Sequence, residues 1–168
     1  LPCRTGGSLS MGKELDYQNG AETAMSLMTS LDVGSDFIFH SFGEMDGLNV
    51  FSFEKYVLDE QIMEARKAAE AIDIFFSEDM SLESMEEGGP GGNYLLEEET
   101  MELYREEIYY PELYNIENYD EWQRNGRISV EEKAAERVKK RLEEYQAPEY
   151  SERQKQILNQ ALKGFEHL

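Results

Sequence analysis

The chain has 168 residues, a formal net charge of −20, and hydrophobic residues at 40% of its positions. Its length suits one domain, and no apolar run approaches the ~20 residues that cross a bilayer, so we expect no membrane-spanning protein. The negative charge repels nucleic-acid phosphates and anionic lipids, so neither nucleic acid nor membrane is expected as a partner, whereas a cationic ligand or a basic protein would suit it.

The cysteine content and the first residue of the chain indicate its cellular compartment and its relation to a longer protein. Cys3 is the single cysteine, which excludes an intramolecular disulfide framework and favours a reducing compartment, so the expected location is cytoplasmic. The chain starts at Leu1 without an initiator methionine, in the manner of a strand cut from a longer protein. We therefore expect a piece of a larger protein.

In the first half, two short extended segments alternate with two helical ones. Residues 1–5 are predicted as a strand and, after a glycine-rich loop, 16–31 as a helix, because apolar residues recur there at spacings of three and four. A second apolar strand at 36–40 precedes another glycine-containing loop and a helix over 53–76. This βαβα order predicts an α/β fold with a parallel sheet, whose missing strands lie upstream or in another subunit.

The second half is predicted to be helical and carries most of the acidity. Helices are expected within 77–92, over 97–107, around 118–124, and over 129–145 and 151–164, with Ser129 and Glu132 forming a capping box. The glycine cluster at 88–92 lacks the Lys-Ser/Thr of a phosphate loop and is interpreted as a turn. Residues 54–121 hold 21 acids against 4 bases. These acids belong either to solvated helix faces or to a docking surface.

Three groups of residues carry a resemblance. The first is Leu1-Pro2, Gly7-Ser8, Lys13, Asp16, Gln18 and Gly20. The second is Phe51-Ser52-Phe53-Glu54 with Asp59. The third is Gly91-Gly92-Asn93-Tyr94-Leu95, Thr100, Tyr119, Trp122 and Gly126. In this order and spacing they resemble the trimethylamine methyltransferase family over nearly the whole chain.

The resemblance implies a fold and an activity. The fold is the C-terminal portion of a (β/α)8 TIM barrel, with its last two strands and helices in 1–76 and a helical C-terminal extension in 77–168. The implied activity moves a methyl group from a small methylated amine to the cobalt of a corrinoid. That corrinoid belongs to a cognate partner protein, so no cofactor is expected on this chain, and a homo-oligomer is expected. Active sites of such barrels lie in the loops after the strands, here 6–16 and 41–49.

Leu9 marks a departure from the founding members of that family. Those members carry pyrrolysine in the first loop, and aligning Gly7-Ser8 and Lys13 with their motif places this residue at Leu9. Leucine has no imine with which to activate an amine. The chain therefore resembles the branch that lacks pyrrolysine, whose studied members act on quaternary amines such as glycine betaine.

A quaternary amine leaves as a neutral amine, so its demethylation needs no general acid, and the enzyme's task is to hold and orient a cation. Aromatic rings and carboxylates suit that task. Candidate substrate-binding residues are His40, Phe42, Glu44, Asp46, Asp16 and Gln18, with Leu9 shaping the cavity. His40 could equally be held by backbone partners, Asp46 could be a solvated acid, and Asp16 is better placed to cap the following helix.

Other functions stay open at this point. The chain could be a non-catalytic acidic helical module that docks another protein, or part of a folate-dependent barrel methyltransferase. Paired carboxylates also suggest a glycosidase or a metal site, but the two histidines, His40 and His167, lie too far apart to share one. The aromatic residues between Tyr104 and Trp122 favour packing of the extension over a docking site.

Overall fold

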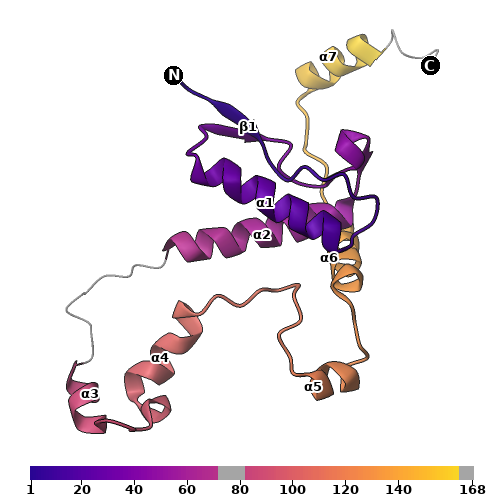
Figure 1. Cartoon of the computed structure of the whole chain (residues 1–168). Coiled ribbons are helices and arrows are strands. Elements are labelled where there is room, and N and C mark those ends of the chain that lie inside the picture. Colours follow the sequence, from indigo (N-terminus) through magenta and orange to yellow (C-terminus); the bar gives the residue numbers. More distant parts are fainter. Residues whose placement is uncertain (72–81, 163–168) are drawn as a thin grey trace. The chain divides into compact units, whose positions relative to one another are not determined.

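The computed structural model describes residues 1–71 and 82–162 (Figure 1). Within the chain, residues 1–138 form one compact unit and 139–168 a second. Among the described residues, no helix is long and apolar enough to cross a membrane. The expected boundary between residues 76 and 77 falls outside the described part of the chain.

A parallel pair of strands confirms the predicted βαβ unit. Strand β1 (Arg4–Gly6) pairs with β2 (Phe37–Phe39), with Arg4 opposite Phe37, and helix α1 (Tyr17–Asp32) connects them. Both strands are shorter than predicted, because over the described residues each has a partner on one side only. The described part is an α/β structure that is mostly helical, and it contains no closed barrel.

The loop predicted after the second strand contains a small hairpin. Strands β3 (Glu44–Met45) and β4 (Val50–Phe51) are antiparallel and flank the 3-10 turn η1 (Asp46–Leu48). Two-residue strands are too short to show the alternation that identifies a strand in a sequence. Asp46, Gly47 and Leu48 all have positive φ, which the sequence signals only at the glycine.

Helix α1 begins and ends as predicted but buries a different face. Asp16 caps its N-terminus by accepting a hydrogen bond from the Asn19 amide, and Gly34 follows its end with φ of +67°. The buried residues are Asn19, Thr23, Leu27 and Ser30. Met25, which belongs to the apolar pattern, is 73% exposed. The buried face is mainly polar because Ser30 donates a hydrogen bond to the Gly6 carbonyl and Thr23 accepts one from Lys55.

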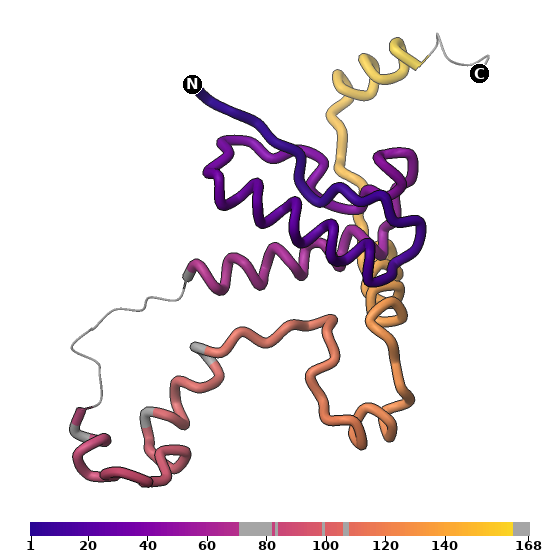
Figure 2. Tube along the Cα trace, in the orientation of Figure 1, coloured from indigo at the N-terminus to yellow at the C-terminus, as the bar shows by residue number. Residues whose placement is uncertain are grey.

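Helix α2 (Phe53–Ala71) lies beside α1, and the two traces run side by side in Figure 2. It is buried on two faces, one carrying Lys55 and Asp59 and the other Val57 and Gln61. The sequence predicted an inner face made of Tyr56, Leu58, Ile62, Met63 and Ala69, which is wrong in part, since Ala69 is exposed and the other four are only partly buried. Its predicted continuation over residues 72–76 lies outside the described residues.

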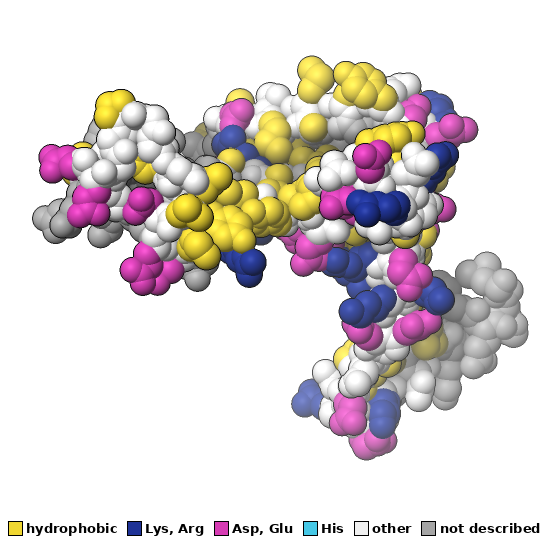
Figure 3. Space-filling model, turned by 90° about the horizontal axis from the view of Figure 1, so that it is seen from below, with side chains coloured by type: hydrophobic (Ala, Val, Ile, Leu, Met, Phe, Trp, Pro, Cys, Tyr) yellow, Lys and Arg dark blue, Asp and Glu magenta, His cyan; other side chains and the backbone are white. Residues whose placement is uncertain are grey.

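The remaining helices follow the predictions closely. They are α3 (Leu82–Gly88), the 3-10 turn η2 (Tyr94–Leu96), α4 (Glu98–Glu107), α5 (Tyr119–Arg124), α6 (Val130–Glu144) and α7 (Glu152–Leu162). Ser129 and Glu132 exchange the two hydrogen bonds of a capping box at the start of α6. On the face drawn in Figure 3, acidic side chains are scattered among basic and hydrophobic ones rather than gathered into one patch.

A small core joins α2 to the segment that follows α4. Val57, Leu113 and Ala134 are buried together. Gln61, 2% exposed, accepts a 3.0 Å hydrogen bond from the Leu113 amide and donates to the Tyr109 hydroxyl. This contact explains why α2 has a second buried face, which its own periodicity does not reveal.

Candidate functional site

The loops that follow β1 and β2 meet at the same edge of the parallel pair. The Gly7 amide donates a 2.8 Å hydrogen bond to the Phe39 carbonyl. A Cβ at Gly7 would lie 2.6 Å from Ser41 Cα, so only glycine permits this approach of the two backbones. The carboxyl ends of parallel strands are where α/β proteins build their sites, and here both loops contribute to one place.

Polar side chains spaced four residues apart on α1 hold the first loop. Ser30 Oγ donates to the Gly6 carbonyl at 2.6 Å, and Ser26 Oγ donates to the Gly7 carbonyl at 2.5 Å. One turn earlier, Glu22 accepts hydrogen bonds from the Ser10 hydroxyl and the Met11 amide. Because residues four apart share a helix face, one stripe of α1 satisfies the backbone of the loop as far as residue 11.

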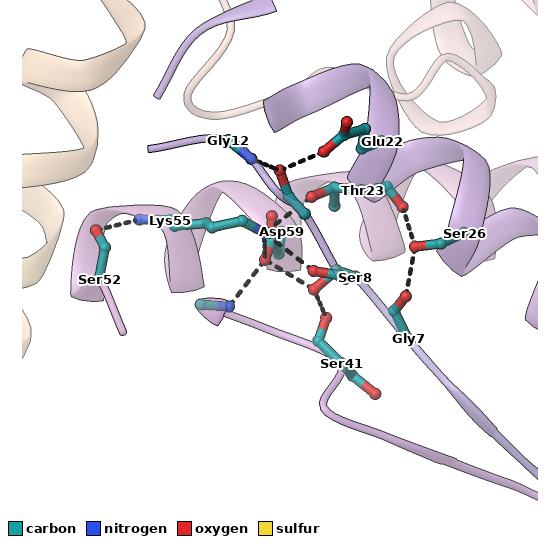
Figure 4. A network of polar contacts seen from close by, with 12 residues as sticks. Gly7, Ser8, Gly12, Glu22, Thr23, Ser26, Ser41, Ser52, Lys55 and Asp59 are labelled. Carbon is teal, nitrogen blue, oxygen red and sulfur yellow. Dashed lines mark hydrogen bonds and ion pairs between the residues drawn. The ribbon is translucent and has the colours of Figure 1, made fainter. Parts of the chain in front are cut away.

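A buried ion pair on α2 lies behind both loops. Lys55 Nζ is 2.5 Å from Asp59 Oδ2, and both side chains are at most 3% exposed. The same carboxylate oxygen accepts from the Gly43 amide at 2.8 Å and lies 2.9 Å from Ser8 Oγ. Lys55 Nζ also donates to the Thr23 hydroxyl of α1 at 2.9 Å and to the Ser8 carbonyl at 3.3 Å (Figure 4).

The burial of this pair opposes both charges. It raises the pKa of the Asp59 carboxyl and lowers the pKa of the Lys55 ammonium group. Their mutual attraction and the surrounding hydrogen bonds act in the opposite direction on each group. A buried pair of this kind is costly to assemble, which points to a role that an apolar pair could not fill.

The second loop presents a carboxylate with one free oxygen. His40 Nδ1 lies 2.6 Å from Glu44 Oε1, and His40 has a positive φ of 53°. Glu44 Oε2 is buried and has no hydrogen-bond partner among the described residues. Buried carboxylate oxygens normally have a donor, so an orphaned one needs an explanation.

Aromatic rings surround this part of the second loop. The ring of Phe42 packs edge-on against Tyr56 of α2, with centroids 5.4 Å apart. Phe39 packs in the same way against His40, at 4.6 Å. Aromatic faces and a carboxylate are the two kinds of group that hold an organic cation.

Comparisons with known proteins show which protein family the chain belongs to. The family model described as trimethylamine methyltransferase (MTTB) matches residues 1–163. The chain belongs to this family.

Relatives within the trimethylamine methyltransferase family are similar over most of the chain. A glycine betaine methyltransferase from Desulfitobacterium hafniense (strain Y51) is 29% identical over 148 residues, which cover 88% of this chain and 31% of that protein. An L-carnitine:corrinoid methyltransferase from Eubacterium limosum is 31% identical over 167 residues, covering 96% and 34%. A trimethylamine methyltransferase MttB from Methanosarcina thermophila is 30% identical over 150 residues, covering 87% and 30%. The chain spans about a third of the length of these relatives.

The structure separates the predicted site residues into two groups. His40, Phe42 and Glu44 lie together on the loop after β2, next to the aromatic rings. Asp16 caps α1, as its sequence position favours. Gln18 donates to Glu22 Oε1, so its amide helps to hold the first loop.

The two remaining predicted residues, Asp46 and Leu9, lie on the second and the first loop. Asp46 pairs with Lys13 at 2.9 Å, and this contact lowers the pKa of the Asp46 carboxyl. Leu9 is 36% exposed and lies against Gly6. The Lys13–Asp46 ion pair thus links the two loops, and the side chain of Leu9 is partly exposed to solvent.

Sequence reasoning missed the residues that hold the site together. Lys55 and Asp59 were not proposed as site residues, although an oppositely charged pair four residues apart near the start of a predicted buried helix is a usable signal. The stripe of Glu22, Ser26 and Ser30 was missed for another reason. Its members interrupt the apolar pattern of α1, and such positions are normally assigned to solvent.

Proposed function

We propose that the chain is part of a methyltransferase that moves a methyl group from a quaternary amine to the cobalt of a corrinoid on a partner protein. Membership of the trimethylamine methyltransferase family supports this, as do the names of relatives that act on glycine betaine and L-carnitine. In this proposal, residues 1–76 supply the last two strands and helices of a TIM barrel, and 77–168 form a helical extension. The adjacent parallel strands β1 and β2 are consistent with that arrangement.

The observation that carries the proposal is the free oxygen of Glu44. A quaternary ammonium group has no N–H, so it offers a carboxylate charge but no hydrogen bond. The Glu44 carboxylate supplies the opposite charge, and the same loop carries the aromatic ring of Phe42, a type of group that holds quaternary ammonium ions. The preference for a quaternary over a protonated amine rests on the names of the relatives. Glu44 is therefore the proposed counter-charge, and the 2.6 Å contact with His40 orients it.

In this proposal the residues of the site bind and orient the quaternary amine. The C–N bond of a quaternary amine is already activated by its permanent charge, and the departing amine is neutral, so no proton has to move. Glu44 and the ring of Phe42 would hold the cation, while Leu9 would shape the cavity through its size alone, because its side chain has no polar atom. The corrinoid of the partner protein accepts the methyl group as a substrate.

The complete gene product tests the proposal with glycine betaine, carnitine, proline betaine and trimethylamine as methyl donors to cob(I)alamin. A quaternary amine should be the best donor. A unit charge roughly 5 Å from the cation contributes about 3 kcal/mol at an effective dielectric of about 20, so Glu44→Gln should lower kcat/KM about 10²-fold. Glu70→Gln, an equal charge change at an exposed position of α2, is the control. If trimethylamine were the best donor, the quaternary-amine assignment would be abandoned.

A further inference from the structure

One carboxylate oxygen contacts both loops of the site, in addition to the direct hydrogen bond from Ser8 Oγ to the Ser41 carbonyl and the Lys13–Asp46 ion pair. Asp59 Oδ2 accepts from the Gly43 amide of the second loop at 2.8 Å and lies 2.9 Å from Ser8 Oγ of the first loop. Gly43 precedes Glu44, and Ser8 precedes Leu9. Each contact therefore lies one residue before a side chain assigned to the substrate pocket.

We propose that Lys55 and Asp59 are a positioning pair that sets the first loop against the second, and thereby sets Leu9 against Glu44. This inference rests on the proposed function. Lys55 also holds the first loop, because its Nζ donates hydrogen bonds to the Ser8 carbonyl of that loop and to the Thr23 hydroxyl of α1. Figure 4 shows these groups converging between α1, α2 and the two loops.

Stability alone does not account for this arrangement. Replacing a buried ion pair with apolar residues of similar volume is often neutral or stabilising, so such a pair is weak evidence of a stabilising role. An apolar pair, however, could not accept a hydrogen bond from the Gly43 amide or reach the Ser8 hydroxyl. The contact of one group with both Gly43 and Ser8 needs an acceptor at the position of Asp59, and that acceptor, buried at 2% exposure, needs the charge of Lys55 beside it.

The double replacement Lys55→Met with Asp59→Leu separates fold stability from loop position in the complete gene product. We expect a denaturation midpoint at or above that of the wild type, with amide hydrogen exchange at Gly43 at least about tenfold faster. Methyl transfer from the best quaternary amine should fall about 10²-fold in kcat/KM, the size of effect that a displacement of about 1 Å produces. Wild-type exchange at Gly43 together with wild-type transfer would overturn the proposal.

A matched control is available on the same helix. Arg66 and Glu70 form a partly exposed ion pair with the same spacing of four residues, and Arg66 also pairs with Asp32 of α1, so Arg66→Met with Glu70→Leu removes an ion pair from α2 away from the loops. This variant should keep the wild-type exchange at Gly43 and the wild-type transfer rate. An equal loss of transfer in the control would overturn the assignment to Lys55 and Asp59.

Two outcomes need a separate readout. If the buried double variant does not fold, Ser8→Ala decides, because it removes the hydroxyl that contacts both Asp59 and the Ser41 carbonyl of the second loop. It should lower transfer about tenfold in a protein that still folds, and unchanged transfer would count against the proposal. If the wild type transfers no methyl group from any of the amines, the proposed function fails. The exchange rate at Gly43 in the double variant then decides the positioning pair independently.

Discussion

Replacing Lys55 alone by methionine leaves Asp59 buried without its counter-charge. Methionine fills a similar volume and removes the contact at 2.5 Å, while the Gly43 amide and the Ser8 hydroxyl remain near the carboxylate. Removing one partner of a buried pair costs about 3–5 kcal/mol when the other stays charged. Domains of this size have a free energy of unfolding of roughly 5–15 kcal/mol, so the loss is a large share of the total.

The loss of unfolding free energy in Lys55→Met should depend on pH, because the buried Asp59 carboxyl can take up a proton. Burial already raises the pKa of this group, and loss of the neighbouring cation raises it further. A group with a raised folded-state pKa contributes stability that is complete below its unfolded pKa of ~3.9 and is lost as pH rises through the folded value. The Lys55→Met variant should therefore lose about 1.4 kcal/mol per pH unit across that window, up to the total of about 3–5 kcal/mol.

Urea denaturation followed by far-UV circular dichroism, in steps from pH 4 to pH 8, measures this loss. Every value is taken relative to Lys67→Met, which makes the same change in net charge at an exposed position of α2. Comparison with this control cancels the effect of one additional negative net charge on a chain whose net charge is already −20. If Lys55→Met stayed within about 1 kcal/mol of the control over the whole range, the buried pair would not have the energetics assigned to it.

Three further predictions concern the loops and the extension. Leu9→Ala should change which betaine is the best donor while leaving measurable transfer, as compared in the same assay; a complete loss of transfer would contradict a role in shaping the cavity. Hydrogen bonds from Gln18, Ser10 and Met11 lower the pKa of Glu22. The stability that these hydrogen bonds contribute is therefore present above the ordinary pKa of ~4.3 and is lost as pH falls through the pKa of the folded state. Amide exchange at Met11, corrected for its intrinsic pH dependence, should accelerate on acidification in the wild type but not in Glu22→Gln. Gln61→Leu leaves the buried Leu113 amide without its acceptor, which should cost about 1–3 kcal/mol and speed chymotryptic cleavage near Tyr109; unchanged stability and cleavage would refute that link.

The sequence predicted the order and type of the elements because those are local properties. The βαβα order, the Asp16 cap, the glycine after α1 and the Ser129–Glu132 capping box all arise from residues within a few positions of one another. The resemblance to a family of barrel enzymes further implied that the site lies in the loops after the two strands, and these loops meet at one edge of the parallel pair. His40 and Glu44, four residues apart, were both among its candidates for the pocket.

Only the tertiary structure decided what holds that pocket together. Asp59 reaches residues 51 and 16 positions away, Ser8 and Gly43, and no pattern within α2 indicates those partners. The polar buried face of α1 has the same origin, because Ser30 is bonded to the Gly6 carbonyl and Thr23 to Lys55 of α2, residues far away in the sequence. Hydrophobic periodicity reports which side of a helix avoids water, but a buried polar group is stable only with a partner that the rest of the fold supplies.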